Sequence, residues 1–463
     1  MTDRVTAQID RSFAGSVERL KAFLRIPSVG TDPAYAADTR RCAAWLAAQL
    51  REIGLVAEVQ PTAGMPMVVG HWAGAGPAAP TILYYGHYDV QPADPFELWH
   101  SPPFEPVVVE GPRGPRIVAR GAVDDKGQVM TWVEALRAWM AAEGRLPVNV
   151  KVLVEGEEEA ASTSFVPFLE ANRDALRADV CVVSDTGMLE VDRPAITYML
   201  RGLVYAEIRL SGPSRDLHSG MYGGAVPNPL NVLVGILAEL HDRAGRVTLP
   251  HFYDRVGEVP PEELRAWAEA GLDEAAFLAE VGLTRSLGEE GRSLTERIWA
   301  RPTCDINGIW GGYAGEGSKT VIPATAGAKL SCRLVPDQDP DEVMAALENF
   351  VRARLPADIK LEFLDHGRGR PVRVPTGSPW LRAARRGIED VFGRPPALIG
   401  CGGSIPVTAP LREILGVDVL FVGFGLDDDR VHSPNEKFEL ACYEKGIRTH
   451  AAMLARFAET TRA

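Results

Sequence analysis

The chain has 463 residues, which exceeds the usual limit of a single hydrophobic core, so we expect two domains. Hydrophobic residues make up 46% of it and charged residues 24%, as in an ordinary soluble globular protein. A formal net charge of -13 disfavours nucleic acid as a partner, because the phosphates would be repelled. The start Met1–Thr6 lacks the apolar core of a secretory signal, and no apolar run is long enough to cross a bilayer. We therefore expect no membrane partner.

The six cysteines are scattered and contain no Cys-x-x-Cys pair. This spacing favours reduced thiols over a disulfide framework or a thiolate zinc site. The expected location is the cytoplasm.

The first elements in chain order are helices over about 5–24 and 36–53, followed by strands over 56–60, 67–72 and 81–85. The run Thr81–Tyr85 is wholly apolar, which is typical of a strand buried on both faces. His87 and Asp89 follow at its carboxyl end, where open α/β sheets place their ligands. At this spacing Asp89 can orient the imidazole of His87. The alternative is a lone histidine that is hydrogen-bonded in a loop.

The next chemical feature is the segment Gly121–Gly127, which contains the pair Asp124 and Asp125. An apolar run precedes it and a helical pattern follows, so the pair is predicted to lie on a strand-to-helix turn. A carboxylate in such a turn can bridge two divalent cations, one through each oxygen. Taken alone, the same pattern also suits a solvated turn with a helix cap.

Two further buried strands, over 148–154 and 180–183, end in acidic residues. The first runs into Glu155–Glu159, which holds four acids in five positions, and the second into Asp185. Acidic runs are usually solvated, but these acids would repel one another severely at the end of a buried strand unless cations or a bound proton relieve the repulsion. Together with His87 and Asp124 they predict a metal site.

From about residue 199 the pattern changes to that of an α+β domain. An alternating strand over 203–210 is followed by a glycine-rich loop that carries His218, and then by helices and strands up to about 375. The chain then returns to the α/β style and passes through His432 before a closing helix. We expect an α/β catalytic domain, with a mostly parallel twisted sheet flanked by helices, formed by 1–198 and 376–463. The inserted domain is 199–375.

Seven motifs in this order resemble the di-zinc aminoacylase and carboxypeptidase clan of metallopeptidases, most of all its cytosolic nonspecific dipeptidase, or carnosinase-like, branch. They are Gly86–Pro92, Arg120–Gly127, Glu155–Glu159, Val183–Asp185, Asp216–Gly220, Gly317–Pro323 and His432–Lys437.

The resemblance implies a role for each matching residue. His87 and Asp185 would bind one metal, Glu159 and His432 the other, and Asp124 both. Asp89 would orient His87, and Glu158 would be the general base. The peptide bond between Asp124 and Asp125 is often cis in such enzymes. Histidine and carboxylate ligands without a thiolate suit two zinc ions, or manganese or cobalt, in an open hydrolytic site.

The resemblance also assigns functions to the inserted domain. His218, from the partner subunit, would stabilise the oxyanion, which makes a homodimer part of the catalytic unit and the insert a lid or dimerisation domain. Arg333 and Ser404 would hold the substrate's carboxylate, because a guanidinium meets a carboxylate with two hydrogen bonds. A loop histidine that only caps a turn and an ordinary strand arginine are the alternatives.

The expected function is metal-dependent hydrolysis of the amide bond of dipeptides or related small carboxylate substrates. One departure leaves an alternative open: relatives often carry Arg-Glu where this chain has Gly400 and Cys401, and the glutamate could have met a substrate ammonium group. An N-acyl-amino-acid deacylase or carbamoyl amidohydrolase of the same clan is therefore the second hypothesis. A catalytically dead scaffold and a two-metal phosphoesterase are the remaining alternatives, disfavoured by the complete ligand set and by Arg333.

Overall fold

The computed structural model describes residues 1–460, which fall into two compact units. Unit 1 comprises Met1–Tyr198, Val374–Ile399 and the chain from Val407 on. Unit 2 comprises Met199–Arg373 together with Gly400–Pro406. The predicted division places this last short segment with the catalytic domain instead. The structure groups it with unit 2 because its backbone packs against Arg201 and Trp299.

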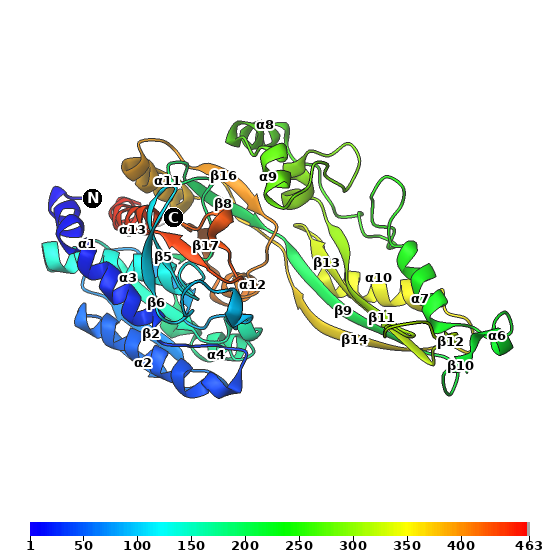
Figure 1. Cartoon of the computed structure of the whole chain (residues 1–463). Coiled ribbons are helices and arrows are strands. Elements are labelled where there is room, and N and C mark those ends of the chain that lie inside the picture. Colours follow the sequence, from blue (N-terminus) through cyan, green and yellow to red (C-terminus); the bar gives the residue numbers. More distant parts are fainter. Residues whose placement is uncertain (461–463) are drawn as a thin grey trace. The chain divides into compact units, whose positions relative to one another are not determined.

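A sheet of nine strands lies largely in unit 1, while its strand β15 and the last residues of β8 and β16 belong to unit 2 (Figure 1). Its order is β1-β2-β6-β3-β7-β17-β8-β15, and β16 pairs with β8. The chain crosses between the two units inside β8 and β16 and directly after β15. The strands are β1 (Val56–Gln60), β2 (Met67–Trp72), β3 (Thr81–His87), β6 (Asn149–Glu155), β7 (Val180–Val183), β8 (Ala195–Leu200), β15 (Val372–Arg373), β16 (Ala397–Cys401) and β17 (Asp418–Phe421).

The middle of this sheet is parallel and its margins are antiparallel. Strands β6, β3, β7 and β17 run in one direction, whereas β1, β2, β8 and β15 pair antiparallel to their neighbours. The predicted α/β class is confirmed, and the sheet is mixed, with the parallel part confined to its centre. Because β3, β6 and β7 point the same way, their carboxyl ends meet at one edge of the sheet.

Helices cover this sheet, and α3 is the central one. It packs against α1, α13 and strand β3, while α12 packs with α4 and α5. Within residues 1–460, none of the helices combines the length and apolar character that a membrane crossing requires. The helices of unit 1 are α1 (Asp3–Leu24), α2 (Ala36–Glu52), α3 (Lys126–Glu143), α4 (Phe165–Ala171), α5 (Arg173–Leu176), α11 (Pro379–Phe392), α12 (Thr408–Leu415) and α13 (Leu440–Ala458), with short turns η1 (Pro33–Tyr35), η2 (Phe96–Leu98), η3 (Glu158–Ala160) and η5 (Asp427–Asp429).

A small second sheet in unit 1 joins distant parts of the chain. Strand β5 (Gly114–Val118) pairs with β4 (Val107–Gly111) on one side and with β18 (Lys437–Glu439) on the other. Just beyond this pairing, the amide of Ala119 donates to the carbonyl of Glu436 at 3.1 Å. The pairing therefore brings the segment that contains His432 to the turn that contains Asp124.

Unit 2 is built on a four-stranded antiparallel sheet of order β11-β13-β9-β14. Helices α7 and α10 pack against its strands (Figure 1). The apolar residues that alternate along β9, from Val204 to Leu210, are buried in the core of this unit. The elements are β9 (Gly202–Ser211), β10 (Leu217–His218), β11 (Thr303–Gly311), β12 (Val321–Ile322), β13 (Thr325–Leu334), β14 (Lys360–Gly369), α6 (Ser219–Tyr222), α7 (Pro229–Ala238), α8 (Pro261–Ala270), α9 (Glu274–Glu280), α10 (Pro340–Arg352) and the π-helical turn η4 (Glu296–Ala300).

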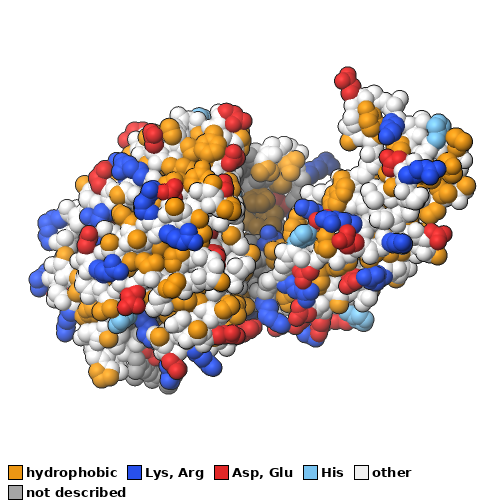
Figure 2. Space-filling model, turned by 90° about the horizontal axis from the view of Figure 1, so that it is seen from below, with side chains coloured by type: hydrophobic (Ala, Val, Ile, Leu, Met, Phe, Trp, Pro, Cys, Tyr) orange, Lys and Arg blue, Asp and Glu red, His pale blue; other side chains and the backbone are white. Residues whose placement is uncertain are grey.

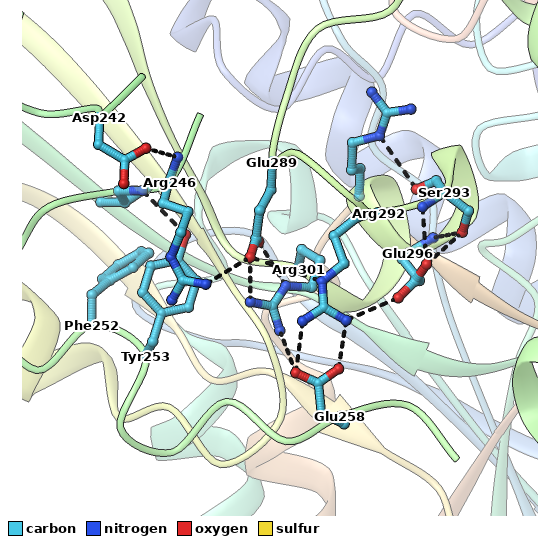
Figure 3. Close-up of polar contacts among 12 residues, drawn as sticks. Asp242, Arg246, Phe252, Tyr253, Glu258, Glu289, Arg292, Ser293, Glu296 and Arg301 are labelled. Carbon is cyan, nitrogen blue, oxygen red and sulfur yellow. Dashed lines mark hydrogen bonds and ion pairs between the residues drawn. The ribbon is translucent and has the colours of Figure 1, made fainter. Parts of the chain in front are cut away.

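A buried ion-pair network fixes the segment that ends in η4 (Figure 3). Arg301 donates two hydrogen bonds of 2.7 Å to the carboxylate of Glu289, which also accepts from Arg246 at 3.2 Å. The guanidinium of Arg246 lies 4.1 Å from the ring centre of Tyr253. Breaking a buried pair of this kind costs about 3–5 kcal/mol, so the network holds η4 in place. On the surface shown in Figure 2, charged side chains of both signs are intermingled with apolar ones.

Candidate metal centre and carboxylate site

The predicted metal ligands of unit 1 come from the carboxyl ends of three parallel strands and from two loops. His87 is the last residue of β3, Glu159 lies in turn η3 after β6, and Asp185 follows β7. Asp124 precedes helix α3, and His432 precedes strand β18. The structure brings all five into one region of unit 1, where their ligand atoms form two overlapping clusters.

Asp124 belongs to both clusters, and each of its oxygens faces a different histidine. Its Oδ1 lies 3.2 Å from Nε2 of His87, and its Oδ2 lies 3.0 Å from Nε2 of His432. Asp185 completes the His87 cluster and Glu159 the His432 cluster, with Glu159 Oε1 at 3.4 Å from His432 Nε2. Within each cluster the ligand atoms lie within 4.8 Å of one another. The peptide bond between Asp124 and Asp125 is cis.

Asp89 supports this region in two ways. Its backbone carbonyl accepts a hydrogen bond from Nδ1 of His87 at 3.1 Å, which leaves the Nε2 lone pair of His87 facing Asp124. Its carboxylate accepts the backbone amides of Glu158 and Glu159 at 3.3 and 3.1 Å. Asp89 therefore orients His87 and also fixes the turn that carries the two glutamates.

Glu436 holds the backbone of the Asp124 turn. Its carboxylate accepts from the amides of Gly121, Val123 and Asp124 at 2.9, 3.0 and 3.1 Å, and from the guanidinium of Arg120 at 2.7 Å. At Gly127, two residues after the cis bond, an added Cβ would lie 1.9 Å from a backbone oxygen, so only glycine fits.

The electrostatics of the centre reflect crowded negative charge. Burial, and after it the charge of the Asp124 carboxylate, raise the pKa of Asp185 to about 7. Burial also raises the pKa of Glu158 well above its usual value, with Asp185 and Glu159 adding to the rise against the opposing charge of His87. Hydrogen bonds to Asp124 and Glu159 raise the pKa of His432 to about 10. A divalent cation relieves such crowding, because it favours the ionised carboxylates.

The donor set fits divalent metal ions. Among the described residues, Nε2 of His87 and Oε1 of Glu159 are buried polar atoms without a hydrogen-bond partner in the protein. Buried polar atoms are nearly always satisfied, so one orphaned atom in each of the two clusters indicates a missing ligand. Imidazole nitrogen and carboxylate oxygen without thiolate suit zinc, manganese or cobalt.

The remaining predicted site residues lie in unit 2. His218 is an exposed residue whose Nδ1 accepts from the amide of Gly220 at 3.0 Å, at the start of α6. Arg333 lies on β13, and its Nη1 donates to Oγ of Ser404 at 2.9 Å. The structure thus joins Arg333 and Ser404 directly.

The unusual pair Gly400 and Cys401 has a packing explanation. A Cβ added at Gly400 would lie 2.5 Å from the Cβ of Trp299, so a side chain there would force Trp299 to shift. Trp299 belongs to η4 and stacks edge-to-face on Trp267 at 5.3 Å between ring centres. The space that a larger residue at position 400 would need is therefore filled by an aromatic ring.

Several supporting residues could not be assigned from the sequence. Gln91 donates to Glu159 at 2.7 Å, and the amides of Met65 and Ser164 donate to Glu157 at 3.0 and 3.1 Å. The four acids of Glu155–Glu159 thus divide, since Glu155 accepts from the hydroxyl of Tyr85 and Glu157 from these amides. The only sequence signal for this division is that Glu155 ends the buried apolar strand.

The fold and this centre are those of a metallohydrolase, and the comparisons with known proteins give its family. The model of peptidase family M20/M25/M40 matches residues 83–456, and the chain belongs to this family. The predicted relationship to this clan of metallopeptidases is confirmed.

Similar proteins cover nearly the whole chain. The Cys-Gly metallodipeptidase DUG1 of Candida albicans is 32% identical and is matched over 94% of this chain and 92% of its own length. The human Beta-Ala-His dipeptidase is 31% identical and is matched over 99% of this chain and 93% of its own length. The solved structure of the dipeptidase Dug1p from Saccharomyces cerevisiae has a TM-score of 0.85 at 29% identity and covers 99% of this chain and 98% of its own.

Proposed function

We propose that this protein hydrolyses dipeptides, cleaving the amide bond with water at the centre described in unit 1. The observation that carries the proposal is the position of Asp124, whose two oxygens face His87 and His432 at 3.2 and 3.0 Å. A carboxylate shared in this way is suited to a pair of metal ions. The dipeptidase names of relatives similar over more than 90% of the chain support the substrate class.

The proposed metal ligands follow the two clusters. His87 and Asp185 would hold one divalent ion, Glu159 and His432 the other, and Asp124 both, with zinc as the proposed metal. When bound, two such ions polarise the substrate carbonyl and lower the pKa of a water towards ~7.

Glu158 is the proposed general base. Its backbone is fixed by the hydrogen bond from its amide to Asp89, and the charges of Asp185, Glu159 and His87 act on its half-buried side chain. An ionised Glu158 takes the proton of the attacking water on its carboxylate and gives it to the amine that leaves. Asp89 keeps His87 in the tautomer that presents Nε2.

The residues of unit 2 are proposed to bind the rest of the substrate. Arg333 and Ser404 hold the substrate's carboxylate, and His218 of the partner subunit donates to the oxyanion. A homodimer is therefore part of the proposal. The edge strand β11 supports the homodimer, because it exposes the apolar side chains of Ile306, Ile309 and Trp310. An exposed apolar edge favours association with a second chain.

The location we propose is the cytoplasm, because all six cysteines are free thiols.

Replacing Glu158 by glutamine tests the mechanism. We expect turnover of dipeptides to fall by about 10²–10⁴-fold or more, while metal content, measured by mass spectrometry, stays at the wild-type level. The matched control is Glu170→Gln, at an exposed position of α4, which should keep full activity. Unchanged turnover in the Glu158→Gln enzyme would refute its role as base.

A substrate panel tests the function itself. The metal-loaded enzyme is assayed on dipeptides, N-acyl amino acids and N-carbamoyl amino acids. Hydrolysis of dipeptides is the expected result. Turnover confined to acylated or carbamoylated substrates would overturn the proposal in favour of the second hypothesis.

A further inference from the structure

Two arginines of unit 2 bond to the same loop, 400–404, and neither has an ion-pair partner among the described carboxylates. Arg201 follows strand β8 and Arg333 lies on β13, and both side chains are half-buried. Burial and the positive charge of Arg333 together lower the pKa of Arg201 to about 10. The charge of Asp305, an exposed residue of β11, acts on both arginines and raises their pKa values, but burial outweighs it.

The hydrogen bonds of the two guanidiniums leave most of their donors unused. Nε of Arg201 donates to the carbonyl of Gly402 at 3.0 Å, and Nη1 of Arg333 donates to Ser404 at 2.9 Å. Within residues 1–460 neither guanidinium forms an ion pair with a carboxylate. A guanidinium has five N–H donors in a planar fork, so the pair presents many free donors at one place.

Among the described residues, the fully buried arginines Arg120 and Arg301 are matched by carboxylates, whereas Arg201 and Arg333 are half-buried. Arg120 pairs with Glu436 at 2.7 Å, and Arg301 pairs with Glu289 at 2.7 Å in the network of Figure 3. Removing one partner of a buried pair is strongly destabilising, so unmatched charges in a folded protein need a reason. Two neighbouring guanidiniums without an acid indicate a site that an external anion completes.

The loop from Gly400 to Ser404 is shaped to keep this site open. An added Cβ at Gly402 would lie 2.9 Å from Nη2 of Arg201 and 2.9 Å from the carbonyl oxygen of Ile298. The backbone amide of Arg201 also donates to the carbonyl of Cys401 at 3.3 Å. Arg201 therefore touches the loop that carries Ser404 and lies beside Arg333 at the same time.

We propose that Arg201 is the second cation of the carboxylate site and binds the C-terminal carboxylate of the substrate together with Arg333 and Ser404. This inference rests on the proposed dipeptidase function and adds a specificity-determining residue to it. Two guanidiniums can each donate to a carboxylate oxygen, whereas a neutral C-terminal amide offers one acceptor and no charge. The site therefore selects substrates with a free C-terminus.

The test compares one dipeptide, Ala-Gly, with its C-terminal amide in wild type and in Arg201→Gln. We expect the variant to raise KM for the free acid by about 10–100-fold and to change KM for the amide by less than about 2-fold. Arg201→Lys, which keeps the charge, should recover part of the loss. The matched control is Arg209→Gln, an exposed arginine of β9, which should leave both substrates unchanged.

The outcomes separate a binding role from a structural one. An equal loss for acid and amide means that Arg201 only supports the loop, and the inference is overturned. No loss for either substrate overturns it too, while wild-type hydrolysis of Ala-Gly leaves the proposed function standing.

Calorimetry of the metal-loaded protein with N-acetylglycine and N-acetylglycinamide tests the site without turnover. Tighter binding of the acid, lost in Arg201→Gln, is the expected result. Equal binding of the two ligands by wild type refutes the inference even if the substrate class has been misassigned.

Discussion

Replacing Glu436 by glutamine should destabilise unit 1 and displace the carboxylate of Asp124, although Glu436 itself is not a proposed ligand. Oε2 accepts from Arg120 and Gly121, and Oε1 accepts from Val123 and Asp124. Glutamine has the same shape, but its amide group is a donor. Whichever way the side chain is turned, its NH2 group replaces an oxygen that accepts two hydrogen bonds, so both of these bonds are lost.

The size of the effect follows from these contacts. A hydrogen bond to a charged group contributes about 1.5–3 kcal/mol, so two of them amount to about 3–6 kcal/mol. Arg120 is also left buried without a counter-charge, a loss of about 3–5 kcal/mol that overlaps with the first. We therefore expect the free energy of unfolding of unit 1 to fall by about 3–5 kcal/mol.

Urea unfolding followed by tryptophan fluorescence, at a fixed metal concentration, measures this change. The control is Glu58→Gln on β1, where the side chain is exposed and no loss is expected. Because Glu436 holds the amide of Asp124, turnover should also fall by about 10²-fold, as expected for a misplacement near 1 Å. A variant with the urea midpoint, metal content and turnover of wild type would refute this reasoning.

Three further predictions concern pH, packing and metal. Burial lowers the pKa of His450 from 6.5 to about 3, so its neutral form stabilises the fold above pH 6.5, and this stability is lost as pH falls towards 3. The unfolding free energy of wild type minus that of His450→Gln, measured in chelator, should decrease by about 1.4 kcal/mol for each unit by which the pH falls within this window. A pH-independent difference would contradict the assignment. Gly400→Ala should lower the urea midpoint by the equivalent of about 1–3 kcal/mol, because its added Cβ meets Trp299. The control Gly377→Ala has open space around its Cβ and should have no such effect. Equal midpoints for Gly400→Ala and wild type would show that Trp299 can move aside. Removing the metals with a chelator should lower the thermal midpoint, and adding zinc should restore it. The loss is equivalent to about 4 kcal/mol if the free metal concentration before chelation was 1,000-fold above Kd. An unchanged midpoint would mean that no ion stabilises the Asp124 clusters.

Local sequence patterns located most of the elements around the centre. The apolar run Thr81–Tyr85 predicts a buried strand, and the structure has β3 over Thr81–His87 with His87 at its end. The alternating residues of 203–210 likewise lie in β9 (Gly202–Ser211). These features follow from side-chain periodicity over a few residues, which one strand or helix suffices to express.

Pairings between distant segments escaped the sequence. Strand β18 was not predicted, because Lys437–Glu439 is only three residues long and carries no apolar alternation. Its pairing with β5 brings Glu436 to Arg120, 316 positions away. A buried glutamate and a buried arginine each look like surface residues until their partner is known.

What the sequence by itself determined is the set of candidate ligand residues, the strand ends that present them and the α/β class, since each depends on residues that are neighbours in the chain. Tertiary structure decided which of the four acids of Glu155–Glu159 accept hydrogen bonds from backbone amides and why position 400 is a glycine beside Trp299. It also brought Arg201 and Arg333 to the loop that carries Ser404. These outcomes depend on packing and charge between segments far apart in the chain. Only the folded protein brings those segments within the few ångströms over which such forces act.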